Sequence, residues 1–201
     1  SFRAKKDDWL DIPKKIYTSR QVEMTEAQLK HYKEMKRDLI TQISENEYVE
    51  AQMVLTQMLK LQQISSGFMI HDDKDYSIAG PNPKINTIKE CMEEVTGKVL
   101  IFCVFKYSVR LLLHELKEHN PLGIHGGIPP NTRQHVVTQF NSDPKCRVMV
   151  IQVQSGKYGY TLIGGENEDR CATTIFYENS YSLDARLQAE DRNHRIGQDK
   201  P

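Results

Sequence analysis

Two short runs of apolar residues constrain the fold of this chain more than any other feature. Residues 99–105 and 148–153 are apolar almost throughout. A strand with one face in water alternates apolar and polar residues, so a continuous run predicts a strand covered on both faces. Segments with apolar residues at helical spacing lie between and beside these runs. Strands that alternate with helices predict an α/β fold, a doubly wound parallel sheet with helices on both faces.

The remaining elements of one α/β domain are expected around these two strands. The chain has 201 residues, enough for one such domain with a small helical addition. Apolar spacing and breaker residues predict strands at 98–105, 122–125, 148–153 and 173–177, and helices near 85–95, 109–116, 130–140 and from 182 onward.

A pair of helices is expected before the sheet. Thr25 and Gln28 have the spacing of a capping box, and apolar residues follow at helical spacing up to Ile43. A second helix is predicted from about Tyr48, and the breakers in 71–83 predict a loop. We therefore expect a linker over 1–21, a helical pair over 22–80 and the α/β domain over 81–201.

Composition excludes several classes of function. Lys and Arg together number 27, as do Asp and Glu, so any contact with nucleic acid must come from locally placed groups. No apolar run approaches the about 18 residues that span a bilayer, so no membrane partner is expected. The four cysteines are far apart with no Cys-x-x-Cys pair, which predicts a reducing compartment and no zinc or other metal site.

The segment Gln188–Gln198 carries the most information about chemistry. If it is helical, Gln188, Arg192 and Arg195 share one face, and Gly197 ends the helix just after them. Arginine suits phosphate recognition because its planar guanidinium donates two parallel hydrogen bonds and stays charged. The arrangement predicts two guanidiniums projecting side by side into a cleft.

Other residues of this helix have expected roles as well. Leu183 and Leu187 lie on another face, which we expect to pack on the sheet. His194 is expected to pack or to form a hydrogen bond rather than to catalyse. The alternative for the arginines is an ordinary solvated helix face, balanced by Glu190 and Asp191.

The full string resembles the last motif of the Swi/Snf-family ATPases of helicase superfamily two. The family pattern is Gln-x-x-x-Arg-x-His-Arg-Ile-Gly-Gln, which this chain matches from Gln188 to Gln198. The resemblance implies the second (C-terminal) RecA-like lobe of a DNA-dependent ATPase. It further implies that Arg192 and Arg195 act as catalytic arginine fingers and that Gln188 lies at the ATP.

Other segments match the family in order and spacing. Residues 98–105 resemble the first strand of the second lobe, and residues 155–162 its Ala-Gly-Gly-x-Gly-Leu-Asn-Leu loop. His125-Gly126-Gly127, then Arg133 and Phe140-Asn141, resemble the family's strand, turn and helix. The resemblance covers nearly the whole chain from about Val22.

Glycines at the ends of two predicted strands suggest where ligands bind. Gly156 and Gly159 follow a buried strand, where backbone amides can approach a phosphate of ATP closely; the alternative is an ordinary connecting loop. Gly126 follows another strand and could hold a DNA phosphate, or could belong to a plain turn. The residues expected to contact DNA are His125, Gly126, Ser155, Lys157, Lys106 and Arg133.

Some of these assignments have alternatives of their own. Arg133 shares a helical stripe with Val137 and Phe140, so it could instead lie over the core. Lys106 and Lys157 could simply be solvated, as single lysines usually are.

The chain departs from the family pattern in three places. Residues 178–182 replace the family's Asp-Pro-Trp-Trp-Asn, residues 164–170 lengthen a connection, and Lys157 and Tyr160 stand where small and aliphatic residues are usual. These differences indicate a divergent branch, in a bacterial or viral-host cytoplasm, or in a nucleus if the source is eukaryotic.

The sequence contains neither Gly-x-x-x-x-Gly-Lys-[Ser/Thr] nor Asp-Glu-x-His, so it lacks groups that would hold ATP phosphates and Mg²⁺. We expect ATP with Mg²⁺ as cofactor, held by a first RecA-like lobe, and double-stranded DNA as partner. The isolated lobe is expected to be inactive. The alternatives are a binding module without ATPase activity and an unrelated small nucleotide-binding protein.

Overall fold

The computed structural model describes residues 12–45, 51–195 and 197–200, which fall into two compact units. One, the helical unit, comprises Arg20–Ile88. The other, the sheet unit, comprises the described residues of 1–19 together with those of 89–201. Each unit is described by itself.

Two long helices form most of the helical unit, α1 (Glu26–Glu45) and α2 (Ala51–Ser65). The predicted capping box is present: the Thr25 amide donates to Gln28 Oε1 at 2.9 Å, and the Gln28 amide donates to Thr25 Oγ1 at 3.2 Å. The buried Gln28 side chain also donates to the Ile64 carbonyl at 3.2 Å, which ties the start of α1 to the end of α2. The expected helical pair is confirmed, although the predicted start at Tyr48 lies outside the described residues.

A β-hairpin follows where part of a loop was predicted. Strands β1 (Phe68–His71) and β2 (Lys74–Ser77) pair antiparallel across Asp72 and Asp73. Both aspartates have positive φ, 47° and 57°, as the two central residues of a type I′ hairpin turn require. The loop prediction for 71–83 is therefore wrong over its first half, because the acidic pair that interrupts the apolar pattern forms the turn of a hairpin.

Four parallel strands form the centre of the sheet unit, in the order β4-β5-β3-β6. They are β3 (Val99–Cys103), β4 (Leu122–Ile124), β5 (Val148–Gln152) and β6 (Thr173–Phe176). Every residue of β3 and β5 is buried. The continuous apolar runs therefore did predict strands covered on both faces, and the expected parallel sheet is confirmed.

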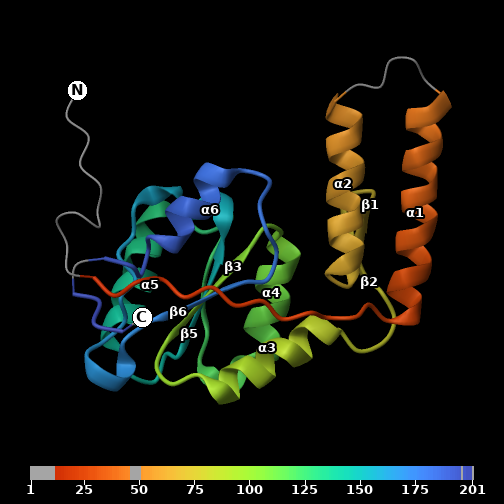
Figure 1. Ribbon diagram of the computed structural model, residues 1–201. Coiled ribbons are helices and arrows are strands. Elements are labelled where there is room, and N and C mark those ends of the chain that lie inside the picture. Colours follow the sequence, from red (N-terminus) through yellow and green to blue (C-terminus); the bar gives the residue numbers. More distant parts are fainter. Residues whose placement is uncertain (1–11, 46–50, 196, 201) are drawn as a thin grey trace, which may run out of the picture. The chain divides into compact units, whose positions relative to one another are not determined.

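Helices cover both faces of this sheet (Figure 1). They are α4 (Lys106–Glu115) on one face, and α5 (Pro130–Ser142) and α6 (Leu183–Glu190) on the other. The helix α3 (Pro83–Glu94) leads into the unit, and short 3₁₀ helices occur at Lys117–His119, Val153–Tyr158 and Asn167–Asp169. A cluster of buried residues joins the sheet to α5 and α6, through side chains such as Phe102, Met149, Phe140 and Ala189. No described helix is long and apolar enough to cross a membrane.

The buried Lys98 caps the C-terminus of α5. Lys98, with only 1% of its surface exposed, donates from Nζ to the carbonyls of Phe140 and Asp143, at 2.5 and 2.7 Å. Arg147 acts similarly at the end of α3, where it donates to the Met92 carbonyl at 2.8 Å. Positive charge at a helix C-terminus satisfies carbonyls that have no partner within the helix. Neither role was predicted from the sequence.

Candidate nucleotide and nucleic-acid interface

The loops that follow the strands meet at one edge of the sheet, because all four strands run in the same direction. One buried amide ties three of these connections together. Gln152, the last residue of β5, accepts from the Gly126 amide at 3.1 Å and donates to the Val104 carbonyl at 3.2 Å. Sequence reasoning missed this residue, although a lone polar side chain at the end of an apolar run was an available signal.

A buried carboxylate organises the start of α4 at the same edge. Glu178, 2% exposed, accepts from the amides of Val104 and Phe105 at 2.8 and 3.3 Å and from Ser108 Oγ at 2.5 Å. Phe105 is the N-cap residue of α4 and supplies no side-chain cap. The acid that follows β6 therefore caps α4 from another element, where its negative charge also favours the helix dipole.

Two of the predicted DNA-binding segments lie side by side here. A Cβ atom placed on Gly126 would lie 3.4 Å from Lys106 Cε, so the exposed Lys106 side chain lies over the loop after β4. In that loop, His125 Nδ1 accepts from the Gly127 amide at 3.1 Å. The structure thus brings Lys106, His125 and Gly126 together, as one local surface of the kind the neutral net charge requires.

The titration of His125 reflects a positive environment. Burial lowers the pKa of His125, and the charges of Lys106, Arg110 and Arg133 lower it further. Each of these cations disfavours a further proton on the imidazole. An anion at this edge would reverse that effect.

Two of the residues predicted to contact DNA are buried. Arg133, 6% exposed, donates from Nε to the Ile128 carbonyl at 2.7 Å and from Nη2 to the His125 carbonyl at 3.5 Å, so it stabilises the turn before α5. The structure favours the alternative of a packing role over direct contact with DNA. Ser155, 5% exposed, is likewise not presented at the surface. Gly156 and Lys157 lie in the same 3₁₀ helix, and the Lys157 side chain lies outside the described part of the chain.

The arginine segment differs from its predicted form. The helix α6 ends at Glu190, so Gln188, Arg192 and Arg195 do not share a helix face, and that prediction is wrong. Gln188 is exposed on α6, Arg192 is 5% exposed, and Arg195 is half-buried. The buried Arg192 side chain therefore does not project outward as predicted, although its charge still interacts with that of Arg195.

The side chain of Asn193 accounts for the early end of α6. Its Nδ2 donates to the Cys171 carbonyl at 3.1 Å, and its Oδ1 accepts from Thr174 Oγ1 at 3.1 Å. These bonds hold the chain against the start of β6, which is incompatible with a helix continuing past Asp191, the C-cap residue.

The face of α6 that packs on the sheet also differs from the prediction. Leu183 and Leu187 are 70% and 49% exposed, so the expectation that they pack on the sheet is wrong. Ala185 and Ala189 occupy the core side instead. Small residues let the helix approach the sheet closely. Arg186 then covers the remaining apolar surface, with its guanidinium carbon 3.3 Å from the centroid of the Phe176 ring.

Arg192 lies beside one of the predicted phosphate-binding glycines. Its Nη1 is 4.0 Å from the position of a Cβ on Gly159, whose φ of +71° is in the left-handed region. The buried Nε of Arg192 has no hydrogen-bond partner. Burial lowers the pKa of Arg192, and the charge of Arg195 lowers it further. An incompletely paired, buried cation next to a second cation would be stabilised by an anion.

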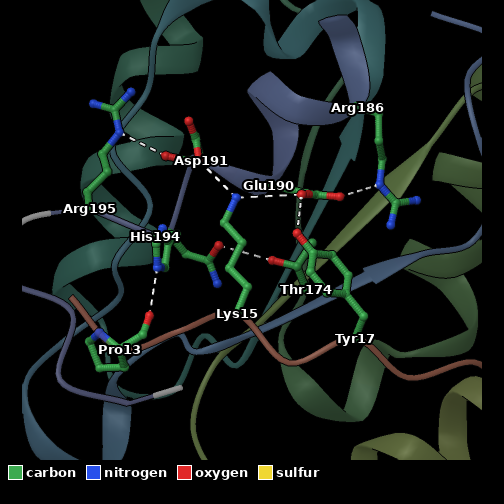
Figure 2. A network of polar contacts seen from close by, with 10 residues as sticks. Pro13, Lys15, Tyr17, Thr174, Arg186, Glu190, Asp191, His194 and Arg195 are labelled. Carbon is green, nitrogen blue, oxygen red and sulfur yellow. Dashed lines mark hydrogen bonds and ion pairs between the residues drawn. The ribbon is translucent and has the colours of Figure 1, made fainter. Parts of the chain in front are cut away.

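Arg195 reaches toward the same loop. It donates from Nη1 to Thr161 Oγ1 at 3.0 Å and from Nε to the Asp191 carbonyl at 3.0 Å. Asn141 holds this loop from α5, because it donates to the Thr161 carbonyl at 2.9 Å and accepts from the Gly164 amide at 3.0 Å. The Phe-Asn pair noted in the sequence thus supports the loop that contacts the arginines. His194 donates to the Pro13 carbonyl at 2.8 Å, as its predicted hydrogen-bonding role requires (Figure 2).

A parallel sheet with helices on both faces is the architecture of a RecA-like lobe. A sequence model described as the helicase conserved C-terminal domain matches residues 83–197. The chain belongs to that family.

Curated relatives come from distant organisms. The chain is 37% identical over 106 residues, 50% of its length, to the human TATA-binding protein-associated factor 172. It is 29% identical over 201 residues, 98% of its length, to an uncharacterized ATP-dependent helicase of Mycoplasma genitalium. These matches span 5% and 19% of the two relatives' own lengths.

Solved structures confirm the fold. The C-terminal part of the Fun30 ATPase domain superposes with a TM-score of 0.68 at 16% identity, covering 90% of this chain and 80% of that one. The Sulfolobus solfataricus SWI2/SNF2 ATPase core in complex with dsDNA gives a TM-score of 0.65 at 22% identity, covering 88% of this chain and 37% of that one. The predicted resemblance to Swi/Snf-type ATPases is confirmed.

Proposed function

We propose that this chain is the C-terminal motor lobe of a Swi/Snf-type ATP-dependent translocase or remodeller of double-stranded DNA. In this proposal Arg192 and Arg195 complete an ATP site whose phosphates are bound by a first RecA-like lobe. The observation that carries the proposal is the buried Arg192 guanidinium, which lies next to a second cation and has an Nε without a partner. A phosphate would supply the missing acceptor and offset the repulsion between the two cations.

The residues fit a phosphate but require a rearrangement to reach one. Arg192 is 5% exposed, so it contacts ATP only after the loop at Gly159 and the segment after α6 move apart. Arg195 needs a smaller change, because its Nη1 is held by the single hydroxyl of Thr161. Closure of the two lobes on ATP would provide the driving force.

The proposed division of labour assigns the metal to the other lobe. Within the described residues no group of three His, Cys, Asp or Glu side chains could hold a metal ion. Mg²⁺ would supply charge neutralisation between the phosphates, and this lobe would add two guanidiniums to the charge that develops on transfer. An arginine finger accelerates such a reaction by roughly 10³- to 10⁵-fold. The isolated lobe would not hydrolyse ATP.

The carboxyl edge is the proposed DNA surface. Lys106 and His125 lie together there beside Gly126, in a field that already lowers the pKa of His125. Such groups bind phosphates without reading bases, as movement along any sequence requires. The name of the Sulfolobus structure, an ATPase core in complex with dsDNA, supports this assignment by analogy.

Turnover by the ATPase that contains this lobe tests the proposal. Arg195→Ala should lower DNA-stimulated kcat by roughly 10³-fold or more while duplex binding stays within about twofold, because a finger acts on the transition state. Arg37→Ala, which removes an exposed cation from α1, is the matched control and should leave turnover unchanged. Near-normal turnover of Arg195→Ala with a folded lobe contradicts the proposal.

The burial of Arg192 also favours a second candidate, a non-catalytic nucleic-acid or protein binding module with a retained RecA-like fold. That alternative predicts duplex binding without any ATP turnover in the unmodified protein, at every DNA concentration.

A further inference from the structure

An extended segment lies across the end of α6 and the arginine segment (Figure 2). Its residues 13–17, here called the strap, make contacts through every second residue. The Pro13 carbonyl accepts from His194, Lys15 Nζ donates to Asp191 Oδ1 at 3.0 Å, and Tyr17 Oη donates to Glu190 Oε2 at 2.9 Å. The side chains of Lys15 and Tyr17, two residues apart in an extended chain, point the same way, and Pro13 contacts the same surface through its backbone carbonyl.

We propose that Lys15 and His194 are positioning residues, through which the strap sets the place of Arg192 and Arg195. The inference rests on the proposed function, because it concerns the orientation of the two proposed arginine fingers. None of the strap residues would touch ATP. They would act only through the backbone of residues 190–195.

The contacts bracket Arg192 on both sides. Lys15 holds Asp191, the residue before Arg192, and Pro13 holds His194, two residues after it. The Asp191 carbonyl in turn accepts from Arg195 Nε at 3.0 Å. A shift of Asp191 would therefore move Arg192 through the chain and Arg195 through this hydrogen bond.

The other side of the network is attached to the rigid core. Lys15 Nζ also lies 3.5 Å from Glu190 Oε2, and the Glu190 side chain is only 10% exposed. Glu190 is held by Arg186 at 2.7 Å, and the Arg186 guanidinium lies over the Phe176 ring of β6. The strap is thus anchored to the sheet at one end of the arginine segment, while it reaches past Arg192 at the other.

The strap contacts influence the position of the arginine segment more than an isolated surface ion pair would. Beyond Glu190, where α6 ends, the amides of Asp191 and Arg192 still donate to the carbonyls of Leu187 and Ala189, at 3.2 Å each, whereas residues 193–195 lie outside these helical hydrogen bonds. The strap continues directly into Arg20, where the helical unit begins. A displacement of the strap toward either end of the chain would therefore displace the arginine segment through these contacts.

Amide hydrogen exchange tests the mechanical part of the proposal in this chain. Lys15→Ala should speed exchange of the amides of residues 191–195 by about fivefold, and adding Tyr17→Phe should bring the change to about tenfold. Lys14→Ala is the matched control, because it removes the exposed neighbouring lysine and should change nothing. His194→Phe should act like Lys15→Ala, whereas His194→Gln, which keeps a donor, should largely restore protection. Unchanged exchange in Lys15→Ala and His194→Phe overturns the proposal.

A double-mutant cycle in the ATPase that contains this lobe tests the functional part. Lys15→Ala should lower kcat about fivefold with KM for ATP unchanged, and it should have no further effect once Arg192 and Arg195 are both replaced by Ala. A merely structural role would lower the activity of both backgrounds by the same factor, and that result also overturns the proposal.

The two proposals fail differently. If the arginine variants keep full turnover, the proposed function is wrong whatever the exchange data show. If the arginine variants are inactive and Lys15→Ala is normal in exchange and kcat, only the strap proposal is wrong.

Discussion

Removing the carboxylate of Glu178 should destabilise the lobe more than any comparable change of an exposed acid. This side chain accepts three hydrogen bonds, two from the amides of Val104 and Phe105 and one from Ser108 Oγ. Two of its partner residues, Val104 and Ser108, are buried. In Glu178→Ala their donors lose their acceptor where water does not readily replace it, and the start of α4 loses its cap.

The magnitude follows from these contacts. Each stranded buried donor costs about 1–3 kcal/mol, and the lost charge at the N-terminus of α4 about 0.3–1 kcal/mol. With two such donors, Glu178→Ala should lower the free energy of unfolding by about 2–7 kcal/mol. Ser108→Ala removes only one bond, so it should cost about 1 kcal/mol. Glu178→Gln should fall between the two, since one oxygen remains to accept.

Hydrogen exchange under increasing urea can follow the lobe separately from the helical unit. The probes are the backbone amides of β3, whose every residue is buried. Glu118→Ala is the matched control, because its side chain is 67% exposed. If Glu178→Ala shifts the unfolding free energy of β3 by less than about 1 kcal/mol, the carboxylate does not hold the carboxyl edge, and the capping argument is refuted.

Two further predictions follow from the geometry. Gly97→Ala should destabilise the lobe by more than about 2 kcal/mol, because φ is +82° and the new Cβ would lie 2.5 Å from a backbone oxygen. Gly80→Ala, at φ +101° with open space around the new Cβ, should show only the conformational cost of about 1 kcal/mol. Equal denaturation midpoints for the Gly97→Ala and Gly80→Ala proteins would contradict this reasoning. The pKa of His125, lowered in the free protein by burial and by neighbouring cations, should rise when duplex DNA binds, since a phosphate favours the charged imidazole. Binding then takes up a proton and tightens as pH falls toward the lowered pKa of the free protein, as NMR titration and affinity measured against pH can check; a pKa unmoved by DNA contradicts a phosphate at this edge.

The parallel sheet could be predicted because its signal is local. A run such as Val99–Phe105 is apolar in every residue, and only a strand covered on both faces suits that composition. The capping box of Thr25 and Gln28 is also a matter of spacing within one segment, and it formed as predicted. The hairpin at Asp72 and Asp73 was missed because the same residues favour both loops and turns, and only the pairing of the flanking strands distinguishes the two.

The supporting residues of the candidate site could not be predicted, because their partners are distant in sequence. Glu178 caps a helix that begins 72 residues earlier, with amides 73 and 74 residues away. Lys98 satisfies carbonyls 42 and 45 residues later. Helical spacing predicted that Arg192 and Arg195 share one face. The helix ends earlier because the Asn193 side chain donates to the Cys171 carbonyl, 22 residues away in sequence.

The early end of α6 changes how the two arginines can work. On a continuous helix, their position would depend only on how that helix packs, and closure of the lobes would have to move it as a whole. In the observed structure, the position of Arg192 depends on separate contacts, among them Asn193 against β6 and Lys15 against Asp191. Breaking one such contact costs about 1 kcal/mol, far less than displacing a packed helix. In the proposed function, a segment held in this way would keep Arg192 beside Gly159 without ATP and would present it when a phosphate provides the missing acceptor for its Nε.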